Sequence, residues 1–281
     1  MSKTLSSAAQ EEFDSEVKHA FQTAGGLRNT VTVRTGVVGD TYNFRKMGKG
    51  MANQKASQED VTPMNITHSK PQATLENWNA PEYTDIFDAA EVNFEEQSEL
   101  ATTISSALGR RLDQLIIDAL DNASAYAGTV TTAIGGADSG MNVDKVRRAS
   151  RYLNDKGVPM SDRHILVSAI GLETMLAETE TTSSDYNTVK ALVNGELDTF
   201  VGFKFHVIES RDEGGLTVGA GDVRDGYAYH KSAIGLAIGI DVKSEVNYIA
   251  QKTSWLANGL MKAGACIRDT DGIVKVQSDE T

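Results

Sequence analysis

The stretch that decides the fold is residues 88–123, DAAEVNFEEQSELATTISSALGRRLDQLIIDALDNA. Its apolar residues recur every three or four positions, which predicts one amphipathic helix over the whole stretch. Asp88 and Glu91 form a capping-box-like start, and Glu95 and Glu99 lie in the first turns, where the helix dipole favours negative charge. At 1.5 Å per residue the helix would span about 50 Å, and a compact chain of this length is about 48 Å across. We therefore expect the helix to cross the subunit, with a buried stripe of Leu100, Ile104, Leu108, Leu112, Leu115, Ile116 and Leu120.

The residues before this helix, 36–86, are extended and polar. Strand-like patterns at 41–46 and 64–68 flank a segment, 47–58, whose glycines and lysines suit an exposed tip. These patterns predict a two-stranded ribbon, and because isolated hairpins are marginal in water, the ribbon must dock on something. The ribbon carries a set of basic residues, which are a weak nucleic-acid patch but suit a contact with an acidic neighbour: Arg45, Lys46, Lys49, Lys55 and Lys70.

Residues 4–23 have the pattern of a short amphipathic helix that ends at the Gly25–Gly26 pair. Its apolar stripe is narrow and consists of Leu5, Ala9, Phe13, Val17 and Phe21. Two interpretations remain open: the helix packs on its own domain, or it is an arm that reaches a neighbour.

The second half of the chain has a mixed α/β pattern. After a small, glycine-rich linker at 124–141, Asn142 is expected to cap a helix that ends near Gly157, and residues 164–168 have the pattern of a buried strand. A strand is also expected within 195–208, and the last third of the chain is rich in strand patterns.

Composition narrows the classes of partner. A formal net charge of −12 disfavours strong, sequence-independent nucleic-acid binding, although a protein that only encloses nucleic acid could carry it. No apolar run approaches the about 18 residues of a membrane span, and no signal-peptide pattern opens the sequence. The single cysteine, Cys266, cannot form an internal disulfide.

The search for reactive sites predicts no catalytic, cofactor-binding or metal site. Ser168 follows a strand as in a nucleophile elbow, but Leu166 and Ile170 replace the two glycines of that motif. The acidic segment at 269–272 lacks the glutamate that closes a calcium loop, which favours a tight turn. The five histidines have no paired metal spacing. An alternative that remains open is a soluble α/β enzyme whose site combines Ser168, His206 or His230, and an acid such as Asp222.

The order of these elements resembles the major capsid protein of tailed bacteriophages with the Hong Kong 97-like fold. Residues 74–78 (TLENW), which precede the long helix, resemble the approach to the spine helix of small capsid proteins, and 143–159 with 163–168 (RHILVS) resemble the first axial helix and strand. The resemblance implies an α+β fold with five parts: an N-terminal arm (1–35), an extended two-stranded loop (36–76), a peripheral domain with the spine helix (77–141), an axial α/β domain (142–240) and returning strands of the peripheral domain (241–281).

By this resemblance the chain would be a virion protein that self-assembles into an icosahedral head shell, built of hexamers and pentamers, around double-stranded DNA in the host cytoplasm. The sequence shows no long N-terminal coiled coil of the kind that acts as a built-in scaffold. The resemblance therefore implies a separate scaffolding protein, along with a portal and a possible decoration protein, and it assigns no crosslinking residue. A cellular compartment shell of the same fold is the sibling alternative. The residues expected at subunit interfaces are Phe13, Val17, Phe21, Phe44, Arg45, Lys46, Lys49, Lys55, Glu95 and Glu99.

Overall fold

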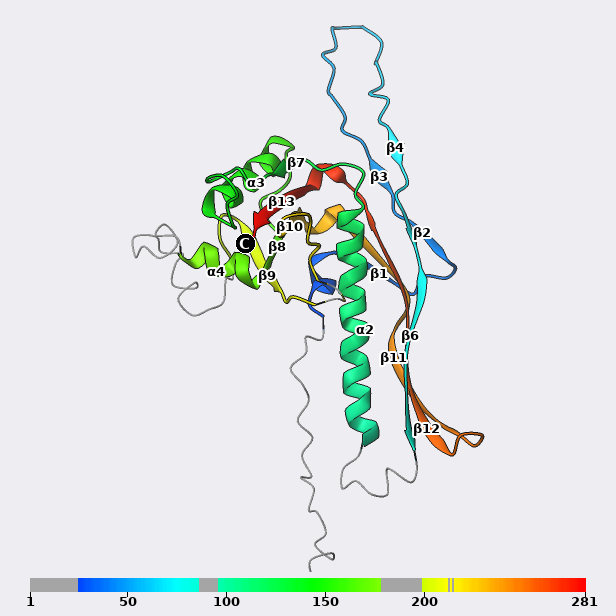
Figure 1. Cartoon of the computed structure of the whole chain (residues 1–281). Coiled ribbons are helices and arrows are strands. Elements are labelled where there is room, and N and C mark those ends of the chain that lie inside the picture. Colours follow the sequence, from blue (N-terminus) through cyan, green and yellow to red (C-terminus); the bar gives the residue numbers. More distant parts are fainter. Residues whose placement is uncertain (1–24, 86–95, 178–198, 212, 214) are drawn as a thin grey trace, which may run out of the picture.

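The computed structural model describes residues 25–85, 96–177, 199–211, 213 and 215–281. Two β-sheets and one long helix form the body, and a ribbon projects beyond it (Figure 1). The described part of the chain contains no helix that is both long and apolar enough to cross a membrane.

A four-stranded sheet runs along one side of the long helix, α2 (Glu96–Asp121). Its strands, in spatial order, are β1 (Thr32–Thr35), β11 (Ile234–Ile249), β12 (Ser254–Ile267) and β6 (Glu76–Asp85). Strand β1 is parallel to β11, and the other two pairs are antiparallel. The register of β11 on β12 shifts on either side of Ile240, where the strand is irregular.

Helix α2 follows the predicted stripe. Its 26 residues span about 39 Å at 1.5 Å per residue. The α2 residues buried in the core are Ile104, Leu108, Leu112, Ile116, Ile117 and Leu120, and Leu100 and Leu115 pack at its margin. Ile117 widens the predicted stripe. The predicted start at Asp88 lies outside the described residues, and the helix ends two residues before the predicted Ala123.

A five-stranded sheet forms the second part of the body. Its strands, in spatial order, are β7 (Gly128–Val130), β13 (Ile273–Asp279), β10 (Val223–His230), β8 (Arg163–Ser168) and β9 (Phe203–Ile208). Helices α3 (Val143–Asp155) and α4 (Ala169–Ala177) belong to this part (Figure 1). The Asn142 cap is confirmed, because its side chain accepts a hydrogen bond from the Lys145 N–H at 2.8 Å.

The predicted ribbon is also present. Strand β2 (Thr41–Asn43) pairs antiparallel with β5 (Gln72–Thr74), and β3 (Lys46–Met47) pairs with β4 (His68–Ser69). Residues 48–67 form the tip and contain no strand. Figure 1 shows the ribbon extending past the ends of both sheets.

The chain crosses from one sheet to the other at positions that differ from the expected domain boundaries. Strand β13 pairs with β10 in the five-stranded sheet, although residues 241–281 were all expected beside the spine helix. Strand β7, expected with the spine helix, pairs with β13, and β11 joins the four-stranded sheet seven residues before the expected division after residue 240. Strand β1, expected in the arm, lies in the same four-stranded sheet. Alternation of apolar residues sets which side chains are buried, but it does not specify which sheet buries them.

Candidate subunit interfaces

Half of the predicted interface residues can be placed. Those outside the described residues are Phe13, Val17, Phe21 and Glu95, and Glu99 lies in α2 with its side chain outside the description. The other five all lie on the ribbon: Phe44, Arg45, Lys46, Lys49 and Lys55.

Phe44 is buried inside its own subunit. Only 5% of its surface is exposed, and it packs with Ala73 and Leu75 in a small core at the ribbon base. The Tyr42 ring meets it edge-on at 4.8 Å, and the Arg268 guanidinium lies 5.3 Å from its ring centroid. Phe44 therefore anchors the ribbon to the body, and its burial does not support an interface role.

Two ribbon lysines, Lys46 on β3 and Lys49 at the start of the tip, bind an acidic turn of the same chain. The acidic turn is Asp269 and Asp271, at the 3₁₀ turn Thr270–Gly272 that leads into β13. Lys46 Nζ lies 2.7 Å from Asp269 Oδ1, and Lys49 Nζ lies 3.7 Å from Asp271 Oδ2. Lys156, at the end of α3, lies 3.0 Å from Asp271 Oδ1, and this hydrogen bond lowers the pKa of Asp271. The sequence favoured a tight turn at 269–272 over a calcium loop, and the structure confirms the turn. Lysine ammonium groups pair with its two aspartates.

Beyond these pairs, the ribbon exposes both charge and apolar surface. Arg45 and Lys55 are exposed, as we expected of interface residues. At and next to the tip, four apolar side chains are each more than half exposed and form what we call the ribbon-tip patch: Met47, Met51, Val61 and Met64. Sequence reasoning treated the tip as polar, although three methionines in so polar a stretch were a signal. Methionine is flexible and suits adaptable contacts.

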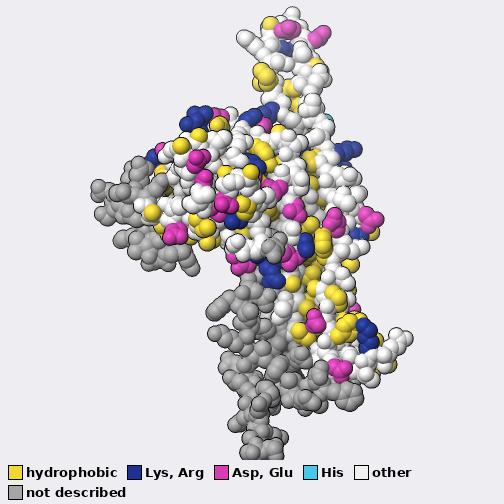
Figure 2. Space-filling view, viewed as in Figure 1, with side chains coloured by type: hydrophobic (Ala, Val, Ile, Leu, Met, Phe, Trp, Pro, Cys, Tyr) yellow, Lys and Arg dark blue, Asp and Glu magenta, His cyan; other side chains and the backbone are white. Residues whose placement is uncertain are grey.

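A second apolar surface lies at the far end of the long hairpin β11–β12. Tyr248 and Val246 are exposed on one face of the hairpin end, and the Tyr248 ring lies 5.3 Å from Trp255. Tyr83 is exposed on the other face, with Lys252 Nζ 3.8 Å from its ring centroid. Figure 2 shows apolar side chains both on the ribbon and near this opposite end.

A third feature fixes the point where the N-terminal segment joins the body. Asp113, on α2, is only 2% exposed and accepts the N–H groups of Gly26 and Leu27, each at 3.0 Å. Burial raises the pKa of Asp113, and these N–H groups oppose that shift. Gly25 has φ +85°, and a Cβ there would lie 2.5 Å from the Gly109 carbonyl oxygen, so glycine is required. From the sequence, the Gly25–Gly26 pair was interpreted only as the end of a helix, and the role of Asp113 was missed. The only signal for Asp113 was a single charged residue beside the apolar stripe.

The residues of the enzyme alternative have separate partners. Ser168 Oγ bonds the Glu280 carboxylate, whose other oxygen lies 2.7 Å from Arg224 Nε. His206 Nε2 lies 3.0 Å from His164 Nδ1, and His230 bonds Ser232. Burial lowers the pKa of His164 to about 4 and lowers the pKa of His206 as well. The structure therefore shows no hydrogen bond from either candidate histidine to Ser168 in the described chain, which also holds no group of three metal-ligating side chains.

Two apolar surfaces at opposite ends of an extended subunit define the class of this protein. Different patches on one chain support heterologous contacts, in which each copy presents one patch to the other patch of the next copy. Exposed apolar surfaces of this kind are typical of a structural protein that associates with further copies of itself.

Comparison with known proteins agrees with this class. A model of the family described as "Phage capsid protein" matches residues 5–280. The capsid structure of cyanophage P-SCSP1u is 17% identical, with a TM-score of 0.77, and the match covers 100% of this chain and 96% of that one. The head structure of Helicobacter pylori bacteriophage KHP40 is 12% identical, with a TM-score of 0.77 and 96% coverage of both chains. A structure of Mycobacterium phage Che8 is 16% identical, with a TM-score of 0.69, and the match covers 95% of this chain and 96% of that one. A search of curated proteins finds no match.

The chain belongs to the phage capsid protein family. The resemblance that the order of elements suggested is confirmed, and the family is one of structural proteins rather than enzymes. The protein is a major capsid protein of the phage head shell.

Proposed function

We propose that copies of this subunit form hexamers and pentamers in a closed shell, and that the ribbon of each copy grips a neighbour. The observation that carries this proposal is the ribbon-tip patch, which holds four apolar side chains in solvent on a segment that projects from the body. An isolated subunit leaves that apolar surface in water, and an adjacent copy removes it from water at about 25 cal/mol per Å².

The hairpin end supports the same proposal from the other side of the subunit. Aromatic side chains are enriched at the centres of protein interfaces, and methionine sulfur makes favourable contacts with aromatic rings. The hairpin-end surface of Val246, Tyr248 and Trp255 therefore offers a partner of suitable chemistry for the ribbon tip of another copy. Each contact is modest, but its repetition around a closed shell makes the assembly stable.

The proposal includes the contents and helpers of the shell. The shell encloses double-stranded DNA without sequence-specific contacts, consistent with a subunit whose formal net charge is −12. A separate scaffolding protein and a portal act during assembly in the host cytoplasm, and the surface of the finished shell is available to a decoration protein. Particles that enclose protein cargo in place of DNA would instead support the compartment alternative.

The experiment replaces the ribbon tip. Residues 48–67 are exchanged for Asn-Gly, a pair that favours the two-residue hairpin turn needed to join Met47 to His68. The variant keeps β2, β5, the Phe44 core and the Lys46–Asp269 pair, and it loses the exposed Lys49–Asp271 pair, which contributes little to stability. It is therefore expected to fold like the wild type, as measured by circular dichroism and urea unfolding. When it is expressed with the scaffolding protein, electron microscopy should show no shells. Shells at the wild-type yield would refute the ribbon's role, and global unfolding would show that the tip belongs to the core.

A further inference from the structure

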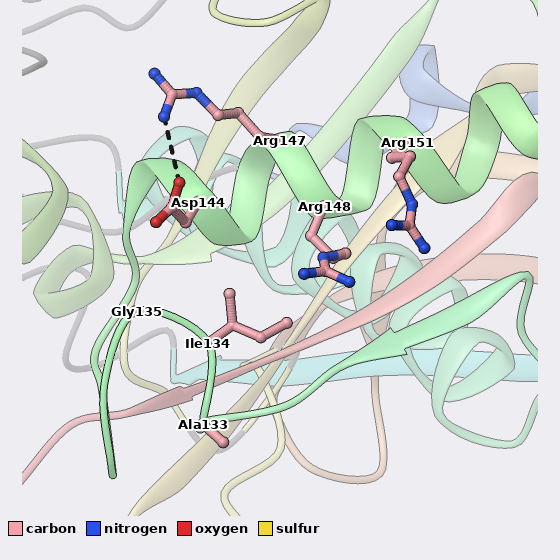
Figure 3. Close-up of a pocket in the computed structure, with 7 residues that line it drawn as sticks. All are labelled: Ala133, Ile134, Gly135, Asp144, Arg147, Arg148 and Arg151. Carbon is pink, nitrogen blue, oxygen red and sulfur yellow. Dashed lines mark hydrogen bonds and ion pairs between the residues drawn. The ribbon is translucent and has the colours of Figure 1, made fainter.

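A hollow of about 560 Å³ lies between helix α3 and the loop that precedes it. One wall is the loop segment 133–135, and the other is a face of α3 that carries Asp144 and three arginines, Arg147, Arg148 and Arg151. Figure 3 shows Arg148 and Arg151 extending from the helix on the side of the loop, whereas Arg147 bends back to Asp144. Neither the family nor the proposed ribbon contact gives this hollow a role.

The loop wall is held in one shape. Asn142 Nδ2 donates to the Ile134 carbonyl at 2.9 Å, and Ser139 Oγ donates to the same carbonyl at 2.6 Å. Gly135 has φ +92°, and a Cβ there would lie 2.1 Å from Asn142 Nδ2, so no larger residue fits. The buried Lys145 ammonium donates to the Ser139 carbonyl at 2.5 Å. A wall fixed by these bonds loses little freedom when something binds, which favours binding.

The charges around the hollow are unevenly paired. Arg147 Nη1 lies 3.2 Å from Asp144 Oδ1, and Arg151 Nε lies 3.6 Å from Asp155 Oδ2. The half-buried Arg148 has no acidic partner within the described part of the chain. Arginine stays charged at every physiological pH, and its planar fork matches the two oxygens of a carboxylate. The hollow therefore presents a guanidinium that an incoming anion can pair with.

We propose that this hollow binds a carboxylate side chain of a second copy of the chain. The proposal rests on the proposed function, because it places a second contact, besides the ribbon, between neighbours in the shell. Each copy supplies 39 acidic residues, so the complementary group is abundant on every neighbour. Charge pairs of this kind set the register of two partners and speed their encounter more than they add affinity.

A DNA backbone fits the hollow less well. Duplex DNA carries one negative charge per about 1.7 Å of axis and is matched by a row of basic groups, but Arg147 and Arg151 are already paired with Asp144 and Asp155, so this face of α3 offers a strand little beyond Arg148. A single side chain can reach Arg148 between these pairs. The hollow is therefore better suited to one carboxylate of a protein side chain than to the successive phosphates of a DNA strand.

The test compares single substitutions with equal changes of charge. Arg148→Glu reverses the proposed contact, and Arg34→Glu, at an exposed position on β1 in the other sheet, is the matched control. Arg148→Lys keeps the charge and loses the fork, and Arg148→Gln removes the charge with little change in size. Each subunit is first shown to be folded and unassembled by circular dichroism and size-exclusion chromatography, and assembly with the purified scaffolding protein is then followed by light scattering and electron microscopy.

We expect Arg148→Glu to slow assembly about tenfold and Arg148→Lys about threefold, with Arg34→Glu near the wild type. Added salt should slow the wild type more than Arg148→Gln, because salt screens the contact. Wild-type assembly rates for both Arg148→Glu and Arg148→Gln would overturn the proposal. Normal assembly followed by easier loss of DNA from the heated shell would also overturn it, and would assign the hollow to phosphate. Failure of the wild type itself to form shells would contradict the proposed function instead.

Discussion

The long helix and the ribbon treat their apolar side chains in opposite ways. On α2, the stripe from Ile104 to Leu120 is buried against the chain's own sheet, and each fully buried aliphatic side chain contributes about 1.5–3 kcal/mol. On the ribbon, Met51 and Met64 remain in solvent, and ion pairs hold the base, each worth about 0–1 kcal/mol. The subunit thus has one part that its own core makes stable and one part that needs a neighbour.

The largest effect should come from truncating one side chain of each kind to alanine and comparing the two variants. Ile116→Ala removes a fully buried side chain of α2 and should lower the free energy of unfolding by about 2–5 kcal/mol, measured by urea denaturation. Met51→Ala, on the ribbon, should change that free energy by less than about 0.5 kcal/mol and instead reduce the yield of shells. If the two variants destabilised the isolated subunit equally, the contrast between the regions would be wrong.

A smaller effect is expected where the N-terminal segment meets the helix. Asp113→Ala leaves the buried N–H group of Leu27 and the partly buried N–H group of Gly26 without their acceptor and should cost about 1–3 kcal/mol. Faster hydrogen exchange at these two amides would report the loss directly. Asp118→Ala, at an exposed position on the same helix, is the control, and it should leave both amides protected. Unchanged exchange in Asp113→Ala would show that Gly25 alone sets this junction.

The smallest effect on stability should fall at the ribbon base. Asp269→Asn with Asp271→Asn removes the partners of Lys46, Lys49 and Lys156, all of them exposed or partly exposed pairs, and should cost about 1 kcal/mol or less. The ribbon should nevertheless lose its fixed direction, because these pairs join it to the start of β13. Spin labels at positions 55 and 34 would show a broader distance distribution, and high salt should broaden the wild-type distribution in the same way. Asp241→Asn, which breaks the Arg28 pair away from the ribbon, should leave the distribution unchanged.

The elements with a strong period were predictable from the sequence. The α2 stripe, the Asn142 cap and the paired ribbon all follow from local spacing and turn chemistry. The sheet that receives β13 was not predictable, because its alternation of Val274 and Val276 suits burial in either sheet. Strand pairing depends on residues far apart in the sequence, and a single sequence carries little information about them.

The candidate surfaces were less predictable than the fold. The basic ribbon was anticipated, but Lys46 and Lys49 bind the chain's own aspartates. Phe44 was expected at an interface, but the ribbon base buries it within the subunit. Asp113 was missed because one acid near an apolar stripe resembles a residue at the stripe's edge, and only the fold brings the two N–H groups to it.

The long pairing of β11 with β12 also has a mechanical consequence. The two antiparallel strands are joined by hydrogen bonds from Ile234–Ile267 at one end to Ile249–Ser254 at the other. Tension that pulls the strands lengthwise past each other would load this ladder in shear, so that many hydrogen bonds must break together. A pull that peels the strands apart from one end would break them one at a time. A shell under outward pressure would therefore be strongest where its contacts load this hairpin along its length.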